Sequence, residues 1–111
     1  MLAAGRDDAL LRFTLGNAYL KEQPALAATH LARAVELNPE YSAAWKIYAK
    51  ALTASGRTSD ARQAYIQGID AATRNGDIQA AKEMRVFLNR LPPNKTRKKG
   101  DALIFPFSRE K

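Results

Sequence analysis

The chain has 111 residues, no cysteine and one histidine, and its formal net charge is +7. This length fits one domain, and the composition excludes disulfides, thiolate metal sites and histidine clusters. Residues 1–8 lack the apolar run of a secretory signal, and no stretch approaches the roughly eighteen apolar residues that a membrane-spanning helix needs. A soluble, cytoplasmic protein is therefore expected.

Apolar residues recur at helical spacing through most of the chain, and no run alternates as a strand would. Pro24 stands where a first helical turn tolerates proline, and Asn38-Pro39 stops a helix. The connections are two to four residues long, so neighbouring helices should pack antiparallel. The pattern predicts five helices, near residues 8–21, 24–37, 42–55, 59–74 and 77–91.

Polar residues mark the expected helix ends. Asp7-Asp8 precedes the first helix, where negative charge meets the positive end of the helix dipole. Candidate N-caps of later helices are Ser42, Thr58 or Ser59, and Asp77, and Asn75-Gly76 suits a left-handed helix end. The apolar positions expected to face the core are Leu11, Leu15, Tyr19, Leu20, Leu26, Leu31, Val35, Leu37, Trp45, Tyr48, Leu52, Ala61, Ala64, Tyr65, Ile69, Ala72, Ile78, Ala81, Met84, Leu88 and Leu91.

The first two helices repeat in the next two. Leu15, Gly16 and Tyr19 correspond to residues 33 positions later, and Ala27, Leu31, Ala34 and Val35 to residues 34 positions later. Small residues stand where two helix backbones would approach closely, and large ones fill the gaps between them. The later members of these pairs are Tyr48, Ala49, Leu52, Ala61, Tyr65, Gly68 and Ile69.

This helix pair resembles the tetratricopeptide repeat. The segments 15–19 (Leu-Gly-Asn-Ala-Tyr) and 34–39 (Ala-Val-Glu-Leu-Asn-Pro) match its pattern, and Trp45 takes its large aromatic position, where the first unit has Arg12. The resemblance covers about residues 8–74 and implies an all-α fold, an α-α superhelix of two such helix pairs. The fifth helix matches only the start of a second repeat helix and is expected to cap the array. Trp45 should be largely buried between the two units.

Catalytic chemistry has no support in the sequence. Nucleophilic catalysis needs a Ser or Cys beside a base, but the one histidine, His30, falls within a helix on a polar-looking face and is expected to be solvated. The acidic residues are scattered, and no glycine-rich phosphate loop is present. We expect no enzyme, no catalytic residue, no cofactor and no metal.

The resemblance implies protein binding in a concave groove lined by the first helix of each pair. Some family members clamp a carboxylate there with a Lys and two Asn; Asn17 fits one such position, but Phe13 and Ile47 replace others. Lys46 and Lys50 lie one turn apart and favour an acidic or amphipathic peptide as the partner. The expected groove residues are Phe13, Asn17, Leu20, Lys21, Lys46, Ile47, Lys50 and Thr53.

Residues 92–111 form a basic tail after the domain at 1–91. They hold six basic and two acidic residues, and so four of the seven net positive charges. The alternative function is a nucleic-acid-associated accessory protein that uses this tail. Four phosphate contacts from residues 95–99 would give a salt slope of about −3.6, which is weak and non-specific binding, and no aromatic residue interleaves the lysines to stack bases. Nucleic acid and membrane are therefore not favoured as partners.

The tail also holds an apolar block, Leu103-Ile104-Phe105-Pro106-Phe107. Burying its large side chains would gain roughly 6–12 kcal/mol, and ordering about eight residues would cost roughly 8–16 kcal/mol. The tail should therefore be flexible in the free protein and dock only transiently. The whole chain is expected to be a monomer or weak dimer.

Overall fold

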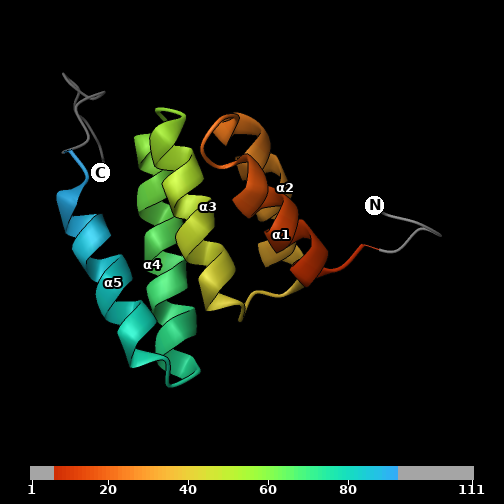
Figure 1. Ribbon diagram of the computed structural model, residues 1–111. Coiled ribbons are helices and arrows are strands. Elements are labelled where there is room, and N and C mark those ends of the chain that lie inside the picture. The colour runs from red at the N-terminus through yellow and green to blue at the C-terminus, as the bar shows by residue number, and fades with distance from the viewer. Residues whose placement is uncertain (1–6, 93–111) are drawn as a thin grey trace, which may run out of the picture.

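The computed structural model describes residues 7–92, which form five α-helices joined by short turns (Figure 1). The all-α prediction is confirmed, and each helix begins and ends within about two residues of its predicted bounds. The apolar block and the basic run of the tail lie outside the described residues. The helices are α1 (Ala9–Tyr19), α2 (Pro24–Leu37), α3 (Ser42–Ala54), α4 (Thr58–Arg74) and α5 (Ile78–Arg90).

The helices form two layers. The first layer holds α1, α3 and α5, and the second holds α2 and α4 (Figure 1). The helix α5 packs on α4 and touches α3, as α3 packs on α2 and touches α1. In space, α5 therefore takes the place that the first helix of a third repeat unit would have. Its sequence, by contrast, matches the start of the second helix of a repeat unit. The predicted array of two helix pairs and a closing helix is confirmed.

Alanine dominates the buried core. The largest fully buried side chains are Leu31, Leu52 and Met84, and small residues surround them because the helix backbones approach closely. Leu26, Leu37 and Ile78 were predicted to be buried, but they are 36%, 36% and 55% exposed. These predictions were wrong because the three residues lie in the first or last turns of their helices, where neighbouring helices cover less of the surface. The buried alanines are Ala27, Ala28, Ala34, Ala44, Ala49, Ala51, Ala61, Ala64, Ala71, Ala72 and Ala81.

The helix ends follow the sequence signals in part. Asp8 caps α1 by accepting a bond from the Leu11 N–H, and Asp77 caps α5 through Ala80. Ser42 is not a cap, because it is the first residue of α3 and its hydroxyl lies 3.4 Å from an Asp77 carboxylate oxygen. Polar residues therefore mark where α1, α3 and α5 begin, but only the two aspartates accept bonds from free N–H groups of the first turn.

The start of α4 departs from the predicted caps in the same way. Thr58 is its first residue, and Arg57 at the N-cap makes no side-chain cap bond. The preceding turn contains Gly56 at φ 79°, and the turn before α5 contains Gly76 at φ 76°. Glycine suits both turns because residues with a Cβ rarely adopt a positive φ.

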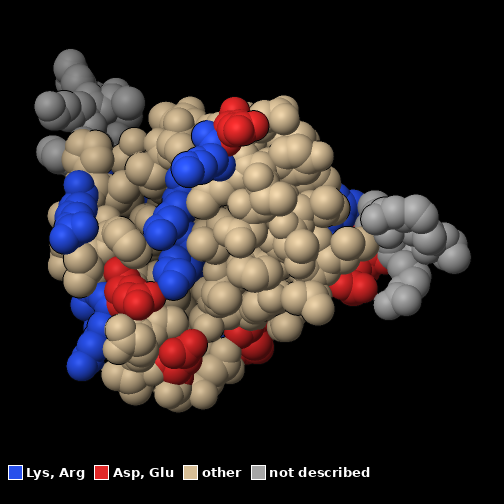
Figure 2. Space-filling model, in the orientation of Figure 1, with Lys and Arg blue, Asp and Glu red and all other residues tan. Residues whose placement is uncertain are grey.

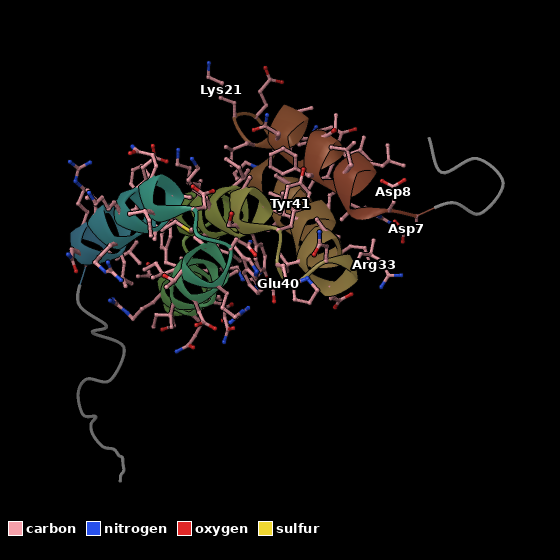
Figure 3. The ribbon with its side chains drawn as sticks, turned by 90° about the horizontal axis from the view of Figure 1, so that it is seen from below. Asp7, Asp8, Lys21, Arg33, Glu40 and Tyr41 are labelled. Carbon is pink, nitrogen blue, oxygen red and sulfur yellow. The ribbon has the colours of Figure 1, made fainter. Side chains whose placement is uncertain are left out.

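Ion pairs tie the connections to the helices. Asp7 binds Arg12 at 2.7 Å and Arg33 on α2 at 2.9 Å, so the segment before α1 is held against the second layer (Figure 3). Hydrogen bonds from Arg12 and then Arg33 lower the pKa of Asp7. In the connection between α2 and α3, Glu40 binds Arg74 at the end of α4 at 2.9 Å. Arg74 also pairs with Asp70 of the same helix.

Candidate functional site

The expected groove residues of the first unit lie along α1 and the turn after it. Asn17 is exposed, and Lys21 is exposed and projects away from the helices (Figure 3). Phe13 and Leu20 are partly buried and pack against the core. The Phe13 ring also lies 5.1 Å from the ring of Tyr41, so much of its surface is used inside the domain. This half of the predicted groove therefore offers mainly polar contacts.

The expected groove lysines of the second unit both contact α5. The Lys46 ammonium binds the Glu83 carboxylate at 2.8 Å, and Lys50 lies 4.7 Å from the centre of the Phe87 ring. The bond from Lys46 is the main cause that lowers the pKa of Glu83. Basic side chains gather along α3 beside α5 (Figure 2). Lys46 is therefore largely neutralised within the protein, which the sequence analysis missed.

The other two residues of this set differ in exposure. Ile47 is partly buried and packs on the core, and Thr53 is exposed with its hydroxyl donating to the Ala49 carbonyl at 2.8 Å. The structure brings the α1 and α3 residues onto adjacent helices of one layer. Glu83 and Phe87 belong to the same surface, and no local signal in the sequence indicated them, because Glu83 is 37 residues from Lys46.

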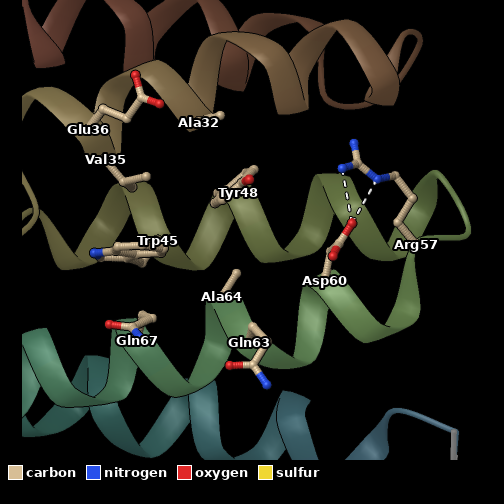
Figure 4. A pocket seen from close by; sticks show the side chains of 10 residues that line it. All are labelled: Ala32, Val35, Glu36, Trp45, Tyr48, Arg57, Asp60, Gln63, Ala64 and Gln67. Carbon is tan, nitrogen blue, oxygen red and sulfur yellow. Dashed lines mark hydrogen bonds and ion pairs between the residues drawn. The ribbon is translucent and has the colours of Figure 1, made fainter.

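A cleft lies on the second layer, between α2 and α4, with α3 as its floor (Figure 4). Its volume is about 360 Å³. Trp45 and Tyr48 of α3 face it with their rings 6.1 Å apart and tilted by 46°. Val35 of α2 and Ala64 of α4 add apolar surface. The cleft exists because α2 and α4 do not approach each other directly.

Trp45 is partly buried and packs between the units, in agreement with the prediction, but part of its ring stays exposed. Its ring packs against the buried core, and its indole N–H donates to the Pro39 carbonyl at 2.8 Å, which fixes the orientation of the ring. The remaining surface of the Trp45 ring lines the cleft, because no helix covers it between α2 and α4.

Polar side chains surround the cleft. Arg57 and Asp60 form an ion pair at 3.0 Å at one end (Figure 4), and Glu36 at the other end pairs with Arg33 at 3.2 Å. Burial raises the pKa of the Tyr48 phenol, so this side chain stays neutral at physiological pH. The cleft therefore has an apolar floor and a rim whose charges are already matched.

His30 was predicted to be solvated, but its side chain is partly buried. Its ring stacks on Tyr19 at 5.7 Å, and its Nδ1 lies 2.9 Å from an Arg12 guanidinium nitrogen. Burial first, and then the Arg12 charge, lower its pKa. The ring accepts a bond in its neutral form and so has a structural role between α1 and α2.

Within residues 7–92, no group of three or more His, Asp or Glu side chains is placed to hold a metal ion. None of the helices in this part of the chain is long and apolar enough to cross a membrane.

The comparisons with known proteins agree with the helix-pair architecture. A family model described as tetratricopeptide repeat matches residues 18–84. The chain is 53% identical, over 97 residues, to the TPR repeat-containing protein PA0015 of Pseudomonas aeruginosa, covering 86% of this chain and 92% of that protein. The chain belongs to the tetratricopeptide repeat family.

Two solution structures are similar in fold. Protein BPP2914 from Bordetella parapertussis is 45% identical with a TM-score of 0.72, covering 88% of this chain and 86% of that one. A tetratricopeptide repeat domain protein from Salinibacter ruber is 26% identical with a TM-score of 0.69, covering 76% of this chain and 86% of that one. Repeats of this family generally mediate protein–protein interaction, and the proteins that carry them are generally non-catalytic scaffolds.

Proposed function

We propose that this protein is a non-catalytic interaction module that holds an extended or helical segment of a partner protein against the α1–α3 face. The observation that carries the proposal is the first layer itself. The helices α1 and α3 lie side by side, with exposed Asn17 on α1, Lys21 in the turn after α1 and Thr53 on α3. Partly buried Ile47 adds apolar contact on the same layer.

The chemistry of this face favours an acidic or amphipathic segment. Lys21 is exposed, and Lys50 is partly exposed with its ammonium 4.7 Å from the centre of the Phe87 ring of α5. Lys46 contributes less to a partner because Glu83 already binds it. We therefore assign the contact with partner carboxylates to Lys21 and Lys50.

The test begins with a pull-down that identifies a partner, followed by affinity measurements with purified components. The variant Lys21→Glu/Lys50→Glu should bind at least about tenfold more weakly, because like charges across an interface repel. The loss should shrink as salt rises, because exposed charges are screened.

Lys82→Glu is the matched control, since Lys82 is an exposed lysine on α5 that is not part of the groove set. Thermal melting confirms that each variant folds. A partner that binds the parent and the folded double variant equally, while binding is lost on blocking another surface, would overturn the proposed face. The cytoplasmic location and the tail-based alternative function stay predictions.

A further inference from the structure

The cleft between α2 and α4 lies close to the point where the described chain ends. The Pro92 carbonyl accepts a bond of 2.7 Å from the Arg62 guanidinium of α4. Arg62 directly precedes Gln63, which lines the cleft. The α5 ribbon also ends at the same end of the molecule as the turn between α3 and α4 (Figure 1). The chain therefore leaves the helices beside one end of the cleft.

The sequence places an apolar block within reach of it. Residues 93–102 separate Pro92 from the block at 103–107. Ten extended residues span up to about 33 Å, whereas the cleft side of α4 from Arg62 to Gln67 measures about 7.5 Å at the rise of a helix. The block can therefore reach the α4 side of the cleft from Pro92.

The chemistry of the block fits that of the cleft. Aromatic-lined grooves dock extended segments that contain proline, and the block places Pro106 between Phe105 and Phe107. Trp45 and Tyr48 supply aromatic surface at the floor. The cleft volume of about 360 Å³ lies in the range of about 300–1,000 Å³ that is usual for binding pockets.

Charge is not the main attraction. The acidic groups at the rim, Glu36 and Asp60, are each paired with an arginine. The basic run before the block gains little from them, so the apolar floor supplies the attraction.

We propose that residues 103–107 dock in the cleft of their own chain and act as its intramolecular ligand. A short flexible tether holds a segment at roughly millimolar effective concentration, so a weak intrinsic affinity is enough to fill the site. The burial gain and the ordering cost of the block are of similar size, so the tether shifts an otherwise balanced equilibrium toward the docked state. This proposal does not depend on the α1–α3 groove, which lies on the other layer.

A spin-label experiment on the full chain tests the docking. The sequence has no cysteine, so Ser108→Cys gives one attachment site directly after the block. Docking should broaden the amide signals of Ala32, Gln63 and Gln67, which line the cleft. The signals of Lys82 on α5 should keep their width. The reduced, diamagnetic label gives the reference intensities.

Two variants decide whether the cleft is the site. Ala32→Arg places a charged side chain at the cleft wall and should abolish the broadening, whereas Ala18→Arg, at an exposed position of α1 outside the cleft, should preserve it. Broadening centred on Asn17 and Thr53 would overturn the proposal in favour of the groove. Absence of broadening would overturn it altogether. Broadening between labelled and isotope-labelled molecules in a mixed sample would assign the cleft to a second copy instead.

Fluorescence gives an independent measurement, because Trp45 is the only tryptophan of the chain and lines the cleft. In the full chain, Phe105→Ser/Phe107→Ser should shift its emission to the red and raise its quenching by acrylamide. The far-UV spectrum should not change, and Ser108→Ala should leave the emission where it is. Identical emission in the parent and the double variant would contradict docking over Trp45.

Discussion

Gly16 marks a close approach between α1 and α2. A Cβ added there would lie 2.3 Å from the Leu31 Cγ, and Leu31 is fully buried. Gly16→Ala should therefore destabilise the protein by about 1–3 kcal/mol, the usual cost of overpacking. This exceeds the gain of roughly 0.5–1 kcal/mol that alanine brings to an open helix position.

Urea unfolding with a constant m-value measures the change. Thr14→Ala on the same helix is the control, because Thr14 is exposed and such changes stay within about 0.5 kcal/mol. A Gly16→Ala protein more stable than the parent would show that α1 and α2 are further apart than the structure has them.

His30 should give the protein a pH-dependent stability. Burial and the Arg12 charge lower its pKa from the ordinary 6.5, so the folded state favours the neutral ring that accepts the Arg12 bond. The unfolded chain then binds the proton more readily. The free energy of unfolding should fall as the pH drops below about 6.5, and the loss is complete below the folded-state pKa.

NMR titration measures this pKa directly, because the chain has one histidine. His30→Gln should remove the dependence between pH 5 and 7. The same variant also separates this effect from Asp7, whose lowered pKa confines its titration to more acidic conditions. A measured His30 pKa at or above 6.5 would contradict the described packing.

At the scale of the helices, α5 is fixed to α3 by charge as well as by packing. Lys46 and Glu83 are 26% and 40% exposed and lie 2.8 Å apart. Lys46→Glu should lower the urea midpoint, because it places two carboxylates together. The exchange Lys46→Glu/Glu83→Lys should recover most of the loss, and equal midpoints for the single and exchanged variants would contradict the contact.

The same pair predicts an acid dependence. Because Lys46 lowers the pKa of Glu83 from 4.5, its contribution is present above about pH 4.5 and is lost as the pH falls through the lower folded-state value. Comparison of the parent with Glu83→Gln between pH 3 and 6 measures it.

At the scale of the molecule, the two ends of the array differ in how they are covered. Leu10 on α1 is 64% exposed and Ile78 at the start of α5 is 55% exposed. These are single apolar residues rather than a continuous core, so we expect a monomer or a weak dimer in sedimentation at rising concentration. Leu10→Glu should abolish any weak dimer formed through the α1 end, while Ile78→Glu should not. A tight tetramer would contradict this expectation.

The sequence by itself determined the helices and their order. The same pattern of small and large residues recurs after 33 or 34 positions, and this repeat defined two helix pairs. Small residues such as Gly16 and Ala49 are needed where helix backbones approach closely. Short connections then left antiparallel packing as the one arrangement. Asp77 could be predicted as a cap, and Asp7-Asp8 as negative charge at a helix start, because these carboxylates act within one turn of the chain, whereas the structure showed that Asp8 is the cap of α1.

The tertiary structure decided what each surface residue can do. Lys46 meets Glu83 and His30 meets Arg12 across 37 and 18 positions of sequence, and no local pattern carries such contacts. Trp45 is partly exposed because α2 and α4 stay apart above it, which depends on how three helices pack at once. Periodicity is a property of one helix, whereas the charge of a groove and the depth of a cleft are properties of neighbours that only the folded chain brings together.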